Sequence, residues 1–147
     1  MKLSTKTRYA LRAMVELALR EGQGPVQLRQ IAEAQAISPK YLEQLAIPLR
    51  NAGLVRSERG PAGGYELARP AHAITALDIV QAMEGPLDLL DCLGQTEACD
   101  RSETCAARAL WARVGAAMSD VLAQTTLADL RDAQRRAHAQ AALAYHI

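Results

Sequence analysis

The chain has 147 residues and a formal net charge of +1, and half of its residues are hydrophobic although it contains no phenylalanine and one tryptophan. That length suits one domain with one hydrophobic core. It has no run of about 18 apolar residues, which argues against a membrane-spanning helix. The N-terminal segment carries dispersed charges and no small-residue cleavage site, which argues against a secretory signal. We therefore expect a cytoplasmic protein, in which thiols stay reduced unless they bind metal or sense redox state.

The two parts of the chain differ in charge. Residues 1–60 contain ten Lys and Arg against five Asp and Glu, whereas residues 61–147 contain seven against eleven. A basic front part predicts a polyanionic partner such as nucleic acid, the alternative being chance unevenness.

Hydrophobic spacing predicts three helices in the first part, over residues 4–22, 26–38 and 39–53. Ser4 or Thr5 can cap the first helix. Ser38 is an N-cap for the third helix, with Pro39 at its first position. A short turn therefore separates the second and third helices, as in a helix-turn-helix.

Two short strands are predicted next, at Leu54–Ser57 and Tyr65–Leu67. Between them "ERGPAGG" is a glycine- and proline-rich loop that carries Arg59 and Gly60. It lacks the Gly-Lys-Ser/Thr ending of a phosphate-binding loop and opens no helix, so we reject that reading. A helix-turn-helix followed by a basic hairpin predicts a winged helix-turn-helix.

Three further helices are expected in the second part. Thr75 and Asp78 form a capping box before a helix over 76–84, and Thr126 and Asp129 form another before the last helix. A long helix over 106–124 carries an apolar seam with a coiled-coil period, made of Leu110, Val114, Ala117 and Val121. The seam favours packing on a partner helix over packing within the domain. The tail from about residue 133 is expected to fray.

The predicted fold is therefore mainly α with a small β-hairpin wing, a winged helix-turn-helix followed by a long C-terminal dimerisation helix. The expected organisation is a DNA-binding domain over 1–84, a cysteine loop over 85–105, and the dimerisation and last helices over 106–147.

The second helix of a helix-turn-helix enters the major groove with its N-terminal residues. Gln44 can pair with adenine and Glu43 can accept from cytosine, while Arg59 on the hairpin can enter a minor groove. The alternative is a winged helix used for protein contacts only. The full predicted DNA-binding set is Ser38, Lys40, Tyr41, Glu43, Gln44, Arg59 and Gly60.

All three cysteines lie in the polar segment "DCLGQTEACDRSETC", as Cys92, Cys99 and Cys105. Three thiolates on one loop suit an iron–sulphur cluster or a zinc ion, although the two-residue spacing common in zinc sites is missing. A disulfide switch and three unrelated reduced thiols are the other readings. We favour a cluster, because a free cysteine without a ligand prefers burial whereas these three lie among polar residues.

The segments "STKTRYALRAM", "ISPKYLEQL", "LRNAGLVRSERGPAGGYELARP", "ALW" and "TLADL", together with the cysteine trio, resemble the Rrf2 (Rrf-two) family of bacterial winged-helix regulators. The resemblance runs from Met1 to about Asp132 and is nearest to the IscR branch, with NsrR and RirA as further members. It implies a homodimeric transcription factor whose long helices cross at the dimer interface. In IscR-like members the residues matching Glu43 and Arg59 are a glutamate that helps to choose DNA sites and an arginine of the wing.

The resemblance also implies that Cys92, Cys99 and Cys105 hold a cluster, with [2Fe–2S] favoured over [4Fe–4S]. Such a cluster can be lost when the protein is purified in air. CymR-like members lack the trio, so the chain is expected to differ from them. Arg108 stands where the IscR pattern has a ligand histidine, and arginine has no lone pair to donate. The acidic ligand that other members have near the start of the first helix is also missing, because Lys6, Thr7 and Arg8 stand there. Other candidates for a fourth ligand are water, a small thiol, or one of the side chains of Asp91, Glu97, Asp100, Glu103, His72 and His138.

The sequence thus predicts a homodimeric transcriptional regulator that binds double-stranded DNA and senses through a cluster. A thiol- or zinc-based regulator without a cluster is the first alternative, and a small redox protein that does not bind DNA is the second. No acid–base pair or nucleophile–histidine arrangement is legible, so we expect no enzyme activity.

Overall fold

The computed structural model describes residues 3–146, so Lys2, which we counted in the basic front part, lies outside the described residues. Within this range the fold is mainly helical with one two-stranded antiparallel hairpin, which confirms the predicted class. The elements are α1 (Thr5–Leu19), α2 (Leu28–Gln35), α3 (Pro39–Asn51), β1 (Val55–Glu58), β2 (Gly64–Leu67), a 3₁₀ turn (Ala71–Ala73), α4 (Ala76–Glu84), α5 (Asp91–Gly94), a second 3₁₀ turn (Thr96–Ala98), α6 (Ala106–Gln124) and α7 (Leu127–Ala144).

Helices α1, α2 and α3 pack around one hydrophobic core to which the wing and α4 also contribute. The predicted caps are confirmed, since Ser4 Oγ accepts from the Thr7 N–H at 3.2 Å and Ser38 Oγ accepts from the Tyr41 N–H at 3.1 Å. Helix α2 ends at Gln35, three residues before the predicted end. The reason is Ala36, whose φ of 53° is left-handed and cannot continue a right-handed helix.

Strands β1 and β2 pair from Val55 opposite Leu67 to Glu58 opposite Gly64. Val26 extends this ladder, because it exchanges two backbone hydrogen bonds of 2.8 Å each with Tyr65. At Gly64 a side chain would collide with the Val26 backbone, and at Gly63 it would collide with the Glu58 backbone. Gly63 therefore lets the two strands approach each other, and Gly64 lets the hairpin approach Val26. Residues 3–84, which form the winged-helix unit, are called the head below.

The start of α4 is tied to the junction between α6 and α7. Both predicted capping boxes are present, at Thr75 and at Thr126. The Ala76 N–H donates to Thr125 O at 2.8 Å, and the Leu127 N–H donates to Ile74 O at 2.7 Å. Leu127 is fully buried in the same core as α1 and α3. The base of α6 is therefore held firmly on the winged-helix head.

Helix α7 contacts α1 and continues to Ala144, so the expected fraying from about residue 133 is not seen. The alanine, glutamine and arginine residues of this tail are strong helix formers, which explains the continuation.

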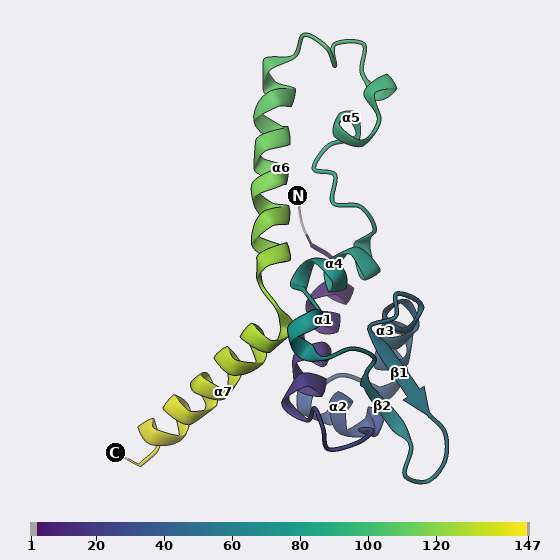
Figure 1. Ribbon diagram of the computed structural model, residues 1–147, viewed down its shortest axis with the longest axis vertical. Helices are drawn as coiled ribbons and strands as arrows, with labels where there is room; N and C mark the ends of the chain where they lie inside the picture. Colours follow the sequence, from purple (N-terminus) through teal and green to yellow (C-terminus); the bar gives the residue numbers. More distant parts are fainter. Residues whose placement is uncertain (1–2, 147) are drawn as a thin grey trace.

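Figure 1 shows α6 rising away from the head, with α5 and the cysteine loop at its far end and the wing loop at the opposite end of the molecule. Within residues 3–146, no helix combines the length and the apolar character needed to cross a membrane.

Candidate DNA interface and cysteine loop

The N-terminal half of α3 presents polar side chains to solvent. Lys40, Glu43 and Gln44 are exposed, and within the described residues none of them takes part in an ion pair or a side-chain hydrogen bond. The opposite face of the helix is buried through Leu42, Leu45 and Leu49. Helix α3 is therefore fixed by its apolar face and leaves an amide, a carboxylate and an ammonium group available for base edges or phosphates.

Two of the predicted DNA-binding residues also have structural contacts. Ser38 caps α3 through its hydroxyl oxygen, which leaves its O–H available as a donor. Tyr41 is half-buried, and its ring meets the ring of Tyr9 in an edge-to-face arrangement with centroids 5.9 Å apart. Tyr41 thus links α3 to α1, and it also lies beside the exposed polar face of α3.

The wing tip carries Arg59, which is exposed and is not used in any ion pair within residues 3–146. Gly60 follows with a φ of +109°, a conformation that other residues rarely adopt, and its carbonyl accepts from the Gly63 N–H at 3.0 Å. This tight turn holds the arginine at the end of the hairpin, where it can reach beyond the head.

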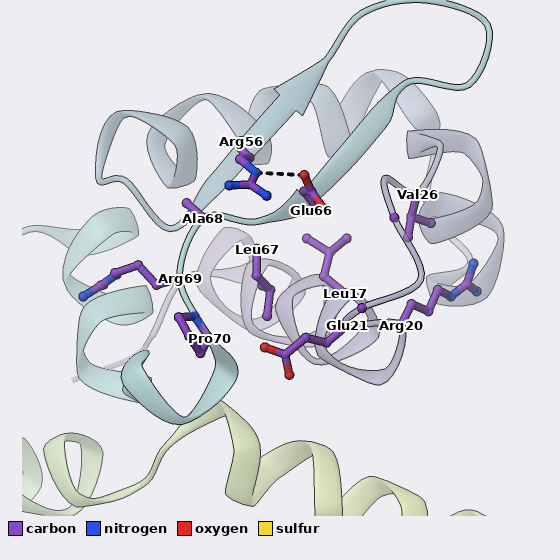
Figure 2. Close-up of a pocket in the computed structure, with 12 residues that line it drawn as sticks. Leu17, Arg20, Glu21, Val26, Arg56, Glu66, Leu67, Ala68, Arg69 and Pro70 are labelled. Atoms are coloured by element: carbon purple, nitrogen blue, oxygen red, sulfur yellow. Dashed lines mark hydrogen bonds and ion pairs between the residues drawn. The ribbon is translucent and has the colours of Figure 1, made fainter.

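A pocket of about 320 Å³ lies at the base of the wing, between the end of α1 and the strands. Figure 2 shows Arg56 and Glu66 side by side on the hairpin, at one wall of the pocket, and their ion pair measures 2.8 Å. Glu21, on the opposite wall, accepts from Arg131 and from the Ala71 N–H, both at 2.9 Å. The two other charged residues of the lining are also paired, Arg20 with Glu16 at 2.7 Å and Arg69 with Asp78 at 3.6 Å. Every charged side chain of the pocket therefore already has a partner, and the pocket offers a ligand no unpaired charge.

The cysteine loop leaves the head after α4. Cys92 lies in the short helix α5, Cys105 directly precedes α6, and Cys99 follows the second 3₁₀ turn. All three are free thiols; Cys99 is exposed and the other two are half-buried. The short helix and the 3₁₀ turn interrupt what the sequence indicated to be a plain polar loop.

A cluster or a metal ion requires the thiols to converge. In the part of the chain that the structure describes, no three Cys, His, Asp or Glu side chains are gathered closely enough to hold a metal ion. The donor types therefore suit a cluster but their arrangement does not fit one, and the loop would have to rearrange to bind it. None of the predicted candidates for a fourth ligand, His72 and His138 included, completes such a group.

Arg108 helps to hold the loop in this arrangement. Its Nε donates to the backbone carbonyl of Cys92 at 3.0 Å, which joins the first turn of α6 to α5. The adjoining segment lies along the same helix, since a side chain added at Gly115 would be in ordinary contact with Leu89. Arg108, for whose position the sequence resemblance implies a ligand histidine in the IscR pattern, thus holds the backbone of the first cysteine.

The predicted seam of α6 is exposed in the single chain. Leu110 is 52% exposed, Val114 43% and Val121 65%. A groove of about 520 Å³ along this face is lined by Leu110, Arg113, Val114, Ala116, Ala117 and Asp120. The other face of α6 turns toward α4 and the cysteine loop. The apolar seam is therefore not used by the domain's own packing.

Sequence reasoning missed several connecting residues. Arg12 lies over the Tyr9 ring and donates from Nε to Gln35 Oε1 at 2.8 Å. Glu84, at the end of α4, accepts hydrogen bonds from the Ser4 N–H at 2.9 Å and from the Thr7 hydroxyl. Hydrogen bonding from Ser4, and then from Thr7, lowers the pKa of Glu84. No local sequence signal indicates contacts between residues so far apart.

Comparison with known proteins gives a consistent family. The Rrf2 family, described as "Iron-dependent Transcriptional regulator", matches residues 3–133. The transcriptional regulator CymR of Bacillus subtilis is 48% identical over 130 residues, covering 88% of this chain and 89% of that protein. The regulator IscR of Vibrio campbellii is 43% identical over 130 residues, covering 88% and 77%. The solved structure of B. subtilis CymR, described as the global cysteine regulator, has a TM-score of 0.76 and 45% identity over 90% of this chain and 97% of that one.

These identities correct one expectation. The cysteine trio suggested that the chain is nearest to the IscR branch and unlike CymR, yet the CymR relative is the more similar of the two, at 48% against 43%. Overall similarity therefore does not assign the chain to the cluster-binding branch.

Proposed function

Because the chain belongs to the Rrf2 family of DNA-binding transcriptional regulators, we propose that it binds an operator as a homodimer and changes its affinity through the state of Cys92, Cys99 and Cys105. The observation that carries the proposal is the joint presence of an exposed polar recognition helix and three free thiols in one loop. A regulator of this kind acts on chromosomal DNA, so its proposed location is the cytoplasm.

The proposed DNA contacts divide by chemistry. Glu43 and Gln44 read base edges in the major groove, while Ser38, Lys40 and Tyr41 hold phosphates or base edges. Arg59, carried by the turn at Gly60, inserts into the neighbouring minor groove. The exposure of Ser38, Lys40, Glu43, Gln44 and Arg59 supports this division.

The proposed dimer uses the exposed face of α6. Leu110, Val114, Ala117 and Val121 repeat with a coiled-coil period and are exposed in the single chain, so a second copy of α6 would bury them. A dimer also presents two recognition helices, and DNA half-sites are read by such pairs.

The proposed sensing group is an iron–sulphur cluster on the three cysteines, with [2Fe–2S] favoured. A bound cluster supplies reactivity toward oxygen, nitric oxide and the supply of iron or sulphur. The residues of this chain hold the loop between α4 and α6, and Arg108 fixes the Cys92 backbone in the arrangement without a ligand. The junction at Thr75 and Thr126 gives a direct route from α6 to the head.

The second candidate is a thiol-based regulator without a cluster. The ungathered thiols and the higher identity to CymR favour it. In that case oxidation or modification of the thiols, with Cys99 the most accessible, would alter the loop directly.

Operator affinity of the wild type and of the Cys92→Ala and Arg59→Ala variants tests both parts of the proposal. We expect Cys92→Ala to keep the fold and the non-specific DNA affinity but to lose any response of operator affinity to iron, oxidant or nitric oxide. The response corresponds to a coupling free energy of about 1–3 kcal/mol, as is usual for two linked sites. A dimer that falls apart on this substitution would make the loop structural.

Arg59→Ala is expected to weaken operator binding and to reduce its salt dependence, because one cationic side chain that displaces counterions from the minor groove is removed. An operator affinity equal to that of the wild type would remove Arg59 from the DNA interface.

A further inference from the structure

Helix α1 contacts both sides of the turn between α2 and α3. Tyr41, in the first turn of α3, meets Tyr9 of α1 with an interplanar angle of 86° and centroids 5.9 Å apart. Such edge-to-face pairs place the positive ring edge against the negative ring face and stabilise one relative orientation. The position of Tyr41 is therefore set by α1 as well as by the core beneath α3.

Gln35, the last residue of α2, is held from the same helix. Arg12 donates from Nε to Gln35 Oε1 at 2.8 Å, and its guanidinium carbon lies 5.4 Å from the centroid of the Tyr9 ring. A planar guanidinium can stack on an aromatic ring while donating in its own plane, which an ammonium group cannot do. Tyr9 and Arg12 are three residues apart and so share one face of α1.

The turn that they flank carries backbone strain. Ala36 lies between the two contacts, with a left-handed φ of 53° that costs an alanine free energy. A strained turn with no support would allow the angle between α2 and α3 to vary. The contacts from α1 to Gln35 before the turn and to Tyr41 after it restrict that angle.

We infer that Tyr9 and Arg12 are positioning residues for DNA recognition: by holding Tyr41 and Gln35 on either side of the turn, they fix the orientation of α3 in the major groove. The inference rests on the proposed DNA-binding function and assigns to α1 a part in it. Tyr9 and Arg12 need not touch DNA for this role, since they act through the two residues that they hold.

The variants Tyr9→Leu and Arg12→Lys test this role. The probes are duplexes selected from a random library by the wild-type protein, and scrambled duplexes of the same composition. We expect Tyr9→Leu to lower the affinity for selected duplexes about 3- to 10-fold, as befits the loss of one aromatic pair. We expect Arg12→Lys, which keeps the charge, to lower it about 3-fold. Neither variant should change the affinity for scrambled duplexes or the salt dependence.

Two controls separate positioning from folding and from charge. Tyr9→Phe keeps the ring and should bind as the wild type does. Arg29→Lys makes the matched change in α2, where Arg29 pairs with Glu33 on the same helix and touches neither side of the turn, and should have no effect. Circular dichroism at the assay temperature confirms that each variant is folded, and Arg12→Lys carries the test if Tyr9→Leu unfolds.

Equal losses on selected and scrambled duplexes, or affinities for selected duplexes within twofold of the wild type, would overturn the inference and leave the proposed function standing. A wild-type protein that selects no preferred duplex from the library would overturn both.

Discussion

Arg108 is the single residue that most alters the chemistry expected of the cysteine loop. The family resemblance assigns a ligand histidine to this position, whereas the guanidinium here donates to the carbonyl of Cys92 at 3.0 Å. A guanidinium stays protonated in proteins and offers no lone pair to iron. Three thiols therefore stand without the fourth protein ligand of the IscR pattern, and a cluster bound here would be labile.

Arg108→His is expected to slow the loss of a cluster, because a neutral imidazole can complete the ligand set. After anaerobic reconstitution with iron and sulphide, the visible absorbance should decay several-fold more slowly in air than in the wild type. Arg108→Leu also removes the hydrogen bond to Cys92 but supplies no ligand, and should not slow the decay. Equal decay of the two variants would contradict an open fourth position.

Glu84 gives a pH dependence to the contact between α4 and α1. Hydrogen bonding from Ser4, and then from Thr7, lowers its pKa, so the folded state favours the carboxylate. A lowered folded-state pKa stabilises the fold above the unfolded value of about 4.5, and this stabilisation is lost as the pH falls through the folded value. Glu84→Gln should therefore unfold more easily at pH 7, and its difference from the wild type should narrow below about pH 4.5 in urea titrations. A difference in unfolding free energy between Glu84→Gln and the wild type that stays constant from pH 7 to below about pH 4.5 would show that the Glu84 carboxylate does not stabilise the fold.

At the scale of helices and strands, the features that could be predicted from the sequence were those that depend on residues close together in the chain. The capping boxes at Thr75 and Thr126 need only residues three positions apart, and both formed as expected. The polar face of α3 also follows from helical spacing. The end of α2 at Ala36 could not be read, because alanine carries no signal for a left-handed conformation. The contacts of Tyr9 with Tyr41 and of Arg12 with Gln35 depend on tertiary packing. The sequence therefore indicated which side chains α3 and the wing present, but not the residues of α1 that contact them.

Ala36→Gly is expected to stabilise the fold by about 0.5–1 kcal/mol. Glycine adopts the left-handed conformation without the penalty of about 1–2 kcal/mol that alanine incurs, which outweighs its greater unfolded-state entropy of about 0.4–1 kcal/mol. Urea denaturation measures the change. Ala34→Gly, in the exposed part of α2, should instead destabilise by about 1 kcal/mol. Destabilisation by both substitutions would mean that the turn carries no relievable strain.

On the scale of the whole molecule, the cysteine loop and the wing lie at opposite ends (Figure 1). Within one chain the cysteine loop is joined to the head by α4 on one side and by α6 on the other. The two helices meet at the junction where Leu127 is fully buried and two backbone hydrogen bonds tie the end of α6 to the start of α4, so coupling can pass through this junction. The exposed seam of α6 gives a second route, because two heads joined through α6 would change their spacing if the helices shift. Regulation of spacing between two heads is therefore consistent with the architecture.

Val114→Glu tests the proposed dimer. A carboxylate in the apolar seam would be desolvated without a partner if two copies of α6 pack together, so the variant should sediment as a monomer. Ala112→Glu makes the same addition of charge on another face of α6, outside the seam, and should leave the dimer intact. A Val114→Glu protein that sediments like the wild type would show that the seam is not the dimer interface.

The measurement that most directly tests sensing through a cluster on the cysteine loop is the visible absorbance of protein purified without oxygen, with its iron and sulphide content. We expect a brown protein with matched iron and sulphide. A triple variant that carries Cys92→Ser, Cys99→Ser and Cys105→Ser should be colourless. A colourless wild-type protein that still binds promoter DNA would contradict the cluster and leave a thiol-based regulator in its place.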